Sequence, residues 1–159
     1  MWGSYQHTSL IECPGDNGCG AIHLGNFNAS RDRKYMTQNN ITHAVVALPK
    51  SQAKNPVFDE LGIVQKIVPC EDDVEFNLFG MLDGVADFIH ENVGNGNLFI
   101  HCMGGISRSP TCLIAFYIKH RQMTFEDALK FVKSKRKHVS PNEGFIEQLK
   151  QFEQIHLTK

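Results

Sequence analysis

The sequence predicts an α/β fold, classed as α+β in some schemes, with a central and mostly parallel sheet of about five strands flanked by helices. Short apolar runs with strand character alternate with longer segments at helical spacing in the middle of the chain. Helical segments then dominate the C-terminal half. The 159 residues suffice for one hydrophobic core, so we expect a single domain over residues 1–159.

The first half of the chain contains a predicted hairpin, a short helix and two strands. Residues 9–11 and 21–24 flank a segment rich in turn-forming residues, which is typical of a hairpin or of two short strands. The polar residues 30–39 predict a short helix. Residues 41–48 form a nearly continuous apolar run, as expected for a strand covered on both faces, and residues 63–68 form a further strand.

The second half contains one predicted strand and four helices. Apolar residues recur at helical spacing over 78–93, and residues 98–101 predict a short strand. After a loop, an apolar helix opens at Ser109. Residues 124–135 start with a capping-box pattern. Residues 140–155 start with a stronger one, in which Ser140 is the expected N-cap of the last helix.

Composition excludes several classes of protein. The 16 Lys and Arg residues balance 17 Asp and Glu residues, and the formal net charge of −1 argues against a general nucleic-acid binder. No run of about 18 apolar residues is present, so we expect no membrane span. The N-terminal segment lacks the apolar stretch of a signal peptide. Five cysteines are too few for a disulfide scaffold, so we expect a reducing compartment, the cytoplasm and also the nucleus.

One predicted strand–loop–helix segment contains residues suited to binding an anion beside a nucleophilic cysteine. It consists of His101, Cys102, Met103, Gly104, Gly105, Ile106, Ser107, Arg108 and Ser109. The strand delivers Cys102 to the mouth of the loop, and the positive end of the following helix points at the same place. Gly104 and Gly105 permit the backbone angles with which amides converge on an anion. Arg108 can add a planar fork for two phosphate oxygens. This setting favours a Cys102 thiolate, a nucleophile aimed at phosphorus.

The same segment resembles the H-C-x5-R signature of the cysteine-dependent protein tyrosine phosphatase superfamily. Over roughly residues 20–155 the chain looks like a small dual-specificity phosphatase. Further motifs follow in that family's order, at residues 22–26, 41–45, 68–73, 115–118 and 141–145. The resemblance implies a phosphatase-like fold and hydrolysis of phosphomonoesters through a phosphocysteine, with no metal and no other cofactor.

The resemblance also implies a role for each site residue. Cys102 attacks phosphorus, while Asp72 protonates the leaving oxygen and then activates water. The family pattern places this acid at the first Asp after Pro-x-Glu, which is Asp72, and Asp73 is the alternative. Ser109 donates to the Cys102 sulfur and eases its departure, although it could also be a plain helix N-cap.

The remaining site residues hold the loop or the phosphate. We expect His101 to orient the loop through hydrogen bonds rather than to touch substrate. Asn142 is expected to fix a neighbouring loop, with a turn or helix-start role as the alternative. The phosphate oxygens are held by Arg108 and by the backbone amides of the substrate-binding residues, which are Met103, Gly104, Gly105, Ile106, Ser107 and Arg108.

The substrate expected from these features is a phosphoprotein, with phosphotyrosine and phosphoserine or phosphothreonine both accepted. Met103, Gly104 and Ile106 are neutral, whereas the phosphoinositide branch of the superfamily typically carries extra Lys in this loop. The alternatives are a phosphatase for phosphoinositides or RNA, and a pseudophosphatase that only binds phosphate. An arsenate reductase is less favoured, because such enzymes carry the loop near the N-terminus.

The other cysteines allow several interpretations. Cys13 and Cys19 could form a metal site or a disulfide, but unpaired thiols are favoured because four ligands at standard spacing are missing. Cys70 lies two residues before the expected acid, so it is either a buried structural thiol or the partner of Cys102 in a reversible disulfide. Cys112 lies in an apolar helix and is expected in the core.

A basic run lies between residues 130 and 137. Cations at a helix C-terminus are its favoured interpretation. Attraction of acidic substrates and a nuclear signal are the alternatives.

Overall fold

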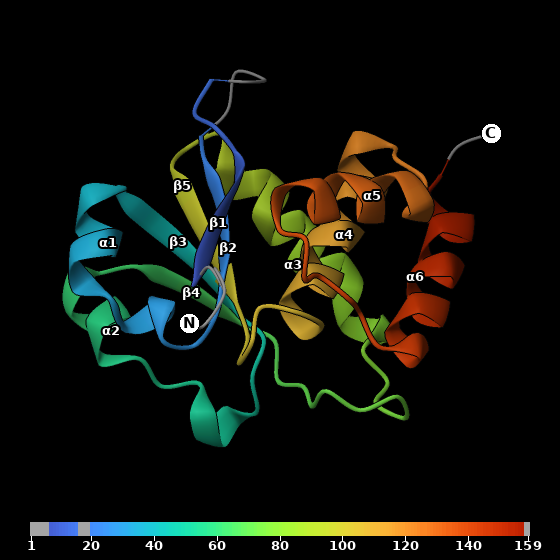
Figure 1. The fold of residues 1–159 in the computed structure, drawn as a ribbon, viewed down its shortest axis with the longest axis horizontal. Coiled ribbons are helices and arrows are strands. Elements are labelled where there is room, and N and C mark those ends of the chain that lie inside the picture. Colours follow the sequence, from blue (N-terminus) through green and yellow to red (C-terminus); the bar gives the residue numbers. More distant parts are fainter. Residues whose placement is uncertain (1–6, 16–19, 158–159) are drawn as a thin grey trace.

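The computed structural model describes residues 7–15 and 20–157 (Figure 1). In this part of the chain five strands form one sheet in the order β1-β2-β5-β3-β4. β1 runs antiparallel to β2, and the other three pairings are parallel, so the predicted fold class is confirmed. The strands are β1 (Thr8–Glu12), β2 (Ile22–Gly25), β3 (Ile41–Val46), β4 (Val64–Ile67) and β5 (Asn97–His101).

Helices cover both faces of the sheet (Figure 1). The N-terminal helices α1 and α2 lie on one face, and the larger group from α3 to α6 lies on the other. α4 is buried over ten consecutive residues, because it packs against β5, α3, α5 and α6. The helices are α1 (Arg33–Gln38), α2 (Pro56–Leu61), α3 (Phe79–Val93), α4 (Arg108–Arg121), α5 (Phe125–Lys135) and α6 (Glu143–His156), with short 3-10 turns at Ala29–Arg31 and Lys50–Gln52.

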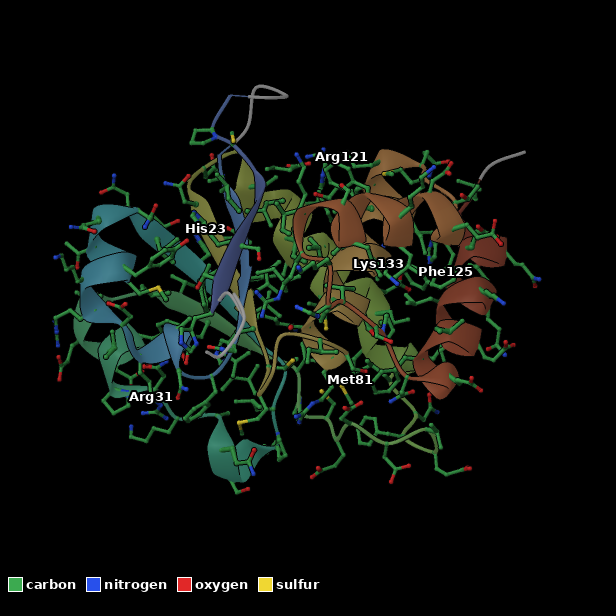
Figure 2. All side chains as sticks on the ribbon, viewed as in Figure 1. His23, Arg31, Met81, Arg121, Phe125 and Lys133 are labelled. Carbon is green, nitrogen blue, oxygen red and sulfur yellow. The ribbon has the colours of Figure 1, made fainter. Side chains whose placement is uncertain are left out.

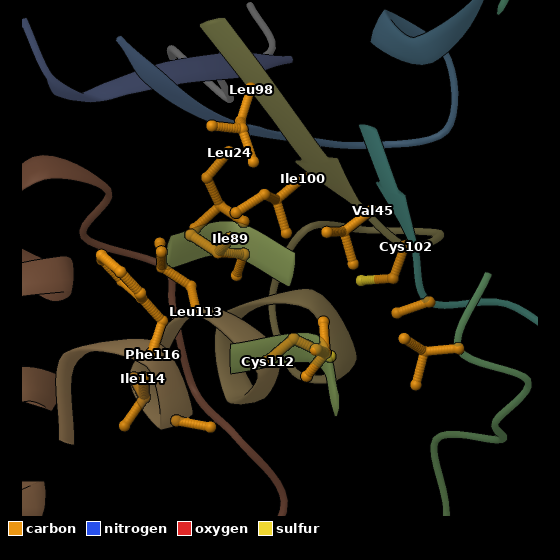
Figure 3. Packing of buried hydrophobic residues seen from close by; sticks show 14 of the residues in the cluster. Leu24, Val45, Ile89, Leu98, Ile100, Cys102, Cys112, Leu113, Ile114 and Phe116 are labelled. Carbon is orange, nitrogen blue, oxygen red and sulfur yellow. The ribbon is translucent and has the colours of Figure 1, made fainter. Parts of the chain in front are cut away.

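The core lies between the sheet and α4. Leu24 and Ile100 from the sheet meet Ile89 of α3 and the α4 residues Leu113 and Phe116 (Figure 3). All five side chains are fully buried. Each such side chain contributes about 1.5–3 kcal/mol by leaving water. This packing fixes α4 against β5, so the loop that joins them is held at both ends.

The central position of β5 decides where that loop emerges. His101 pairs with Gly25 of β2 and with Val46 of β3 in parallel register. The Ala47 amide extends this pairing by donating to the His101 carbonyl at 2.9 Å. Cys102 therefore leaves the sheet at the middle of its carboxyl edge, where ligands of open α/β sheets bind.

β1 is an edge strand tied to the rest of the domain by its polar side chains. The Glu12 carboxylate is buried and accepts two bonds from the Arg121 guanidinium, at 2.8 and 3.4 Å. The Ser9 hydroxyl, near the other end of the strand, accepts from buried Arg136 at 3.1 Å. These contacts join β1 to the C-terminal ends of α4 and α5, at residues 109 and 127 positions further along the chain.

Two short helical segments differ from the prediction. The expected helix over 30–39 is a 3-10 turn followed by α1, because the Asp32 side chain caps a new helix by accepting from the Tyr35 amide. α2 was not predicted. Asn55 caps it, a proline opens it, and Gly62 ends it in the left-handed conformation with φ +68°.

The predicted start of the last helix is wrong by two residues. Asn142, not Ser140, is the N-cap of α6, and its side chain accepts from the Phe145 amide at 2.9 Å. Ser140 lies in the segment between α5 and α6, outside both helices. Its amide donates instead to the Ile106 carbonyl at 2.7 Å. Within the described residues, no helix has the length and apolar character needed to cross a membrane.

Candidate active site

Cys102 lies at the base of the 102–108 loop and is 2% exposed. Its sulfur accepts a hydrogen bond from the Ser109 hydroxyl at 3.1 Å. Ser109 is fully buried in the first turn of α4, whose N-cap position is Ser107, so the alternative of a plain N-cap role for Ser109 is wrong. Figure 3 shows the Cys102 side chain directed toward α4, beside Val45.

His101 supports the loop from inside the protein. Its Nδ1 lies 3.1 Å from the Cys102 carbonyl, and its ring packs edge-on against Phe58. Burial lowers the pKa of His101 to about 4, so the ring is neutral near pH 7. Because a carbonyl only accepts, Nδ1 carries the hydrogen. His101 is 1% exposed, so it does not reach a phosphate bound at the mouth of the loop.

Arg108 connects the loop to the neighbouring strand end. It is half-buried, and its Nη1 donates to the Cys70 carbonyl at 3.3 Å. The Cys70 thiol is buried, and burial raises its pKa to about 12, so the thiol is protonated. Cys70 and Cys102 are both free thiols here, and a reversible disulfide between them stays a prediction.

The 71–77 loop carries the two candidate acids, and their contacts differ. Asp72 is exposed, and its Oδ1 accepts from the Asn142 side-chain amide at 3.0 Å. Asp73 instead uses its Oδ1 to accept from the Glu75 amide at 2.8 Å within its own loop. Asn142 also donates its backbone amide to the Ser107 hydroxyl at 3.0 Å. Asn142 therefore joins Asp72 to the 102–108 loop while it caps α6.

Gly144 allows this arrangement because the 71–77 loop lies directly against the first turn of α6. A Cβ atom at position 144 would overlap the Val74 carbonyl. The Gln148 side chain holds the far end of the same loop by donating to the Phe76 carbonyl at 2.9 Å and accepting from the Leu78 amide at 2.8 Å. The loop with Asp72 is thus fixed to α6.

The two loops that carry Cys102 and Asp72 each expose an apolar side chain. Met103 and Val74 are 43% and 54% exposed. The Phe27 amide donates to the Met103 carbonyl at 2.9 Å, and the Arg31 guanidinium lies 4.4 Å from the centre of the Phe27 ring. Figure 2 places Arg31 at the same end of the molecule as the 102–108 and 71–77 loops, the lower end in that view.

The outer side of the 102–108 loop contacts a residue that sequence analysis did not assign to the site. Arg136 was part of the basic run, but it is 4% exposed and donates to the carbonyls of Gly104 and Gly105. Lys133 and Lys135 of the same run are exposed in the last turn of α5, where the helix-end interpretation fits them.

The remaining candidates lie outside this site. Cys112 is fully buried in α4, as predicted. Cys13 is exposed, and Cys19 lies outside the described residues. Within residues 7–15 and 20–157, no group of three or more His, Cys, Asp or Glu is arranged to hold a metal ion.

Comparison with known proteins identifies the protein family. The model of the dual specificity phosphatase catalytic domain matches residues 22–155. The chain belongs to this family. Dual specificity protein phosphatase 1 of Arabidopsis thaliana is 35% identical over 133 residues, which are 83% of this chain and 65% of that protein. Dual specificity protein phosphatase 21 of Homo sapiens is 33% identical over 134 residues, which are 84% of this chain and 68% of that protein.

Solved structures of the family share the fold. Human tyrosine phosphatase-like serine/threonine/tyrosine-interacting protein has a TM-score of 0.82 at 25% identity, over 95% of this chain and 98% of that one. The chain spans about two thirds of the length of the two sequence relatives. It is a cysteine-dependent phosphatase of the dual-specificity family, with a core domain that corresponds to the catalytic domain of its relatives.

Proposed function

We propose that this protein hydrolyses phosphotyrosine and phosphoserine or phosphothreonine in other proteins through a phosphocysteine on Cys102. The hydrogen bond from the Ser109 hydroxyl to the Cys102 sulfur carries the proposal. A hydroxyl donor at 3.1 Å stabilises negative charge on that sulfur. Such a donor matters twice: it favours the thiolate that attacks, and it favours the thiolate that must later leave.

In the first step the Cys102 thiolate forms a bond to phosphorus as the bond from phosphorus to the ester oxygen breaks. Asp72, as a carboxylic acid, gives its proton to the departing oxygen. Its contact with Asn142 supports this role for Asp72 over Asp73, which is tied to its own loop. Arg108 and the loop amides stabilise the charge on the three equatorial oxygens.

In the second step water attacks phosphorus and the sulfur–phosphorus bond breaks. The Asp72 carboxylate takes a proton from that water, so it returns to the acid form. The electron pair of the broken bond returns to the Cys102 sulfur. The Ser109 hydroxyl stabilises the resulting thiolate by donating a hydrogen bond to it. Inorganic phosphate leaves, and the enzyme regains its starting state.

The mouth of the site supports a phosphoprotein substrate. Met103, Gly104 and Ile106 bring no cation into the loop, so it offers no extra charge for a second phosphate of a phosphoinositide. The exposed apolar side chains of Met103 and Val74 suit contact with the carbon atoms of a phosphorylated side chain. The family's dual specificity supports both classes of phosphorylated residue.

Hydrolysis of 4-nitrophenyl phosphate without added metal tests the reaction, and phosphopeptides with each phosphorylated residue test the substrate class. Cys102→Ser is expected to abolish turnover of all of them. Ser109→Ala is expected to slow the second step, so that a burst of product precedes a slow steady state and a phosphorylated enzyme can be isolated. Ser134→Ala, which removes an exposed hydroxyl in α5, is the matched control and should leave both phases unchanged.

The alternatives predict different results in the same assays. Turnover by Cys102→Ser would contradict the phosphocysteine step. Phosphate binding without any turnover by the parent protein would indicate a pseudophosphatase. Preference for phosphatidylinositol phosphate vesicles over every phosphopeptide would move the substrate to lipid headgroups.

A further inference from the structure

Arg136 differs from its basic neighbours in the degree of burial. It is the C-cap residue of α5 and is 4% exposed, whereas Lys133, Lys135 and Lys137 are exposed. A buried arginine is rare unless its donors are bonded, because removing a guanidinium from water is costly. The contacts of Arg136 therefore indicate what the residue does.

Two of these contacts reach the 102–108 loop from its outer side. The Arg136 Nε donates to the Gly105 carbonyl at 2.9 Å, and its Nη2 donates to the Gly104 carbonyl at 3.2 Å. A third donor, Nη1, bonds the Ser9 hydroxyl of β1 at 3.1 Å. The planar guanidinium thus holds two consecutive carbonyls of the loop in one fixed geometry, with β1 behind it.

The segment after Arg136 continues the same pattern. The Ser140 amide donates to the Ile106 carbonyl at 2.7 Å, so residues 136–140 bond three consecutive carbonyls of the loop. In a trans peptide the N–H points away from the C=O of the same unit. Carbonyls held on the outer side therefore direct the amides of Gly105, Ile106 and Ser107 toward the inner side, where the loop would meet a phosphate.

Gly105 shows how closely this arrangement is packed. Its φ is +67°, which favours glycine, and a Cβ atom there would lie 2.6 Å from the Gly25 carbonyl oxygen and 2.8 Å from the Arg136 Nη2. The loop backbone thus touches β2 on one side and Arg136 on the other. No side chain fits between them, so the guanidinium bonds the backbone directly.

We infer that Arg136 is a positioning residue, which orients the amides of Gly105 and Ile106 for oxyanion binding by holding the carbonyls of Gly104 and Gly105. It does not touch the substrate. The inference rests on the proposed function only in that the oxyanion is the phosphoryl group of the substrate. Lysine cannot replace Arg136 fully, because a single ammonium lacks the fork that reaches two carbonyls.

Tungstate, a tetrahedral oxyanion, serves as the probe in a Cys102→Ser background, where binding is measured by calorimetry without turnover. Arg136→Met is expected to weaken tungstate affinity at least tenfold. Arg136→Lys, which keeps the charge, should weaken it at least threefold. Lys135→Met removes an exposed charge from the same run and is the matched control, with an expected change below twofold.

Binding is measured well below the unfolding temperature of each variant, so a general loss of stability does not move the result. A folded Arg136→Met protein with parental affinity would overturn the inference. If Arg136→Met does not fold, Arg136→Lys decides, and parental affinity in that variant overturns it as well. If tungstate affinity depends on Arg136 as expected, yet the parent protein hydrolyses no phosphate ester, the proposed function is contradicted and this inference stands.

Discussion

Replacing Asn142 by serine separates two contacts that one side chain makes in the structure. The Asn142 oxygen caps α6 by accepting from the Phe145 amide at 2.9 Å, and its nitrogen donates to Asp72 at 3.0 Å. Serine retains an oxygen that can cap the helix. Its shorter side chain lacks the amide that reaches Asp72. Asn142→Ala removes both contacts.

The size of each effect follows from these contacts. Loss of an N-cap side chain costs about 1 kcal/mol, which lowers the Tm of a domain of this size by about 2–4 °C. The bond to Asp72 is exposed, so we expect it to contribute only about 0.5–1.5 kcal/mol to holding the acid in place. That energy corresponds to a loss of about 2- to 13-fold in kcat when the acid is needed.

The assay compares phenyl phosphate, whose leaving group needs a proton, with 4-nitrophenyl phosphate, whose leaving group needs it less. Asn142→Ser should keep its Tm and lose turnover mainly with phenyl phosphate. Asn142→Ala should have both a lower Tm and a lower turnover of phenyl phosphate. Thr124→Ala removes the cap of α5 without touching Asp72, so it should lower the Tm alone. Equal losses with both esters, or full activity of Asn142→Ser, would refute the positioning of Asp72 by Asn142.

Three further predictions follow from the site and the core. Asp72→Asn should slow phenyl phosphate turnover by about 10²–10⁴-fold, and an unchanged rate would move the role to Asp73. Gly144→Ala should displace the loop that carries Asp72 and lower kcat by about 10- to 100-fold, as measured in steady state, and parental kcat would contradict that close contact. Burial lowers the pKa of both His23 and His101 to about 4, so the unfolded chain binds more protons between pH 6.5 and 4. Stability should therefore fall as the pH drops through that window, by about 3 kcal/mol per histidine in urea titrations, and constant stability there would contradict neutral buried rings.

The long amphipathic segments could be predicted from the sequence because their periodicity covers several turns. The pattern over 78–93 became α3, which starts at Phe79. α2 has only six residues, too few for a periodic pattern, although Asn55 and Gly62 mark its ends. Asn55 and Pro56 already form a helix-start signal in the sequence, but without periodicity this signal is not enough to predict a helix. The single-domain organisation stays a prediction.

The core of the site could be predicted because its residues are adjacent in the sequence. Residues 101–109 carry the cysteine, the arginine and the serine that the structure brings together on one loop. Arg136 is different, since it lies 31 residues from Gly105 along the chain and belongs to a run of similar charges. A run of basic residues in a sequence does not show which of them will be buried and which will be exposed. The contact depends on the path of the chain after α5, which no local rule describes.

β1 lies before residue 22, where the family match begins, so a protein fragment cut to residues 22–155 would lose it. β2 would become the edge of the sheet, with a row of backbone N–H and C=O groups that β1 now pairs. Exposed edges of this kind pair with other chains, so such a fragment should self-associate. It would also lose the contacts that Ser9 and Glu12 make with Arg136 and Arg121. A five-residue strand outside the residues that the family model matches should therefore keep the catalytic unit from associating with itself.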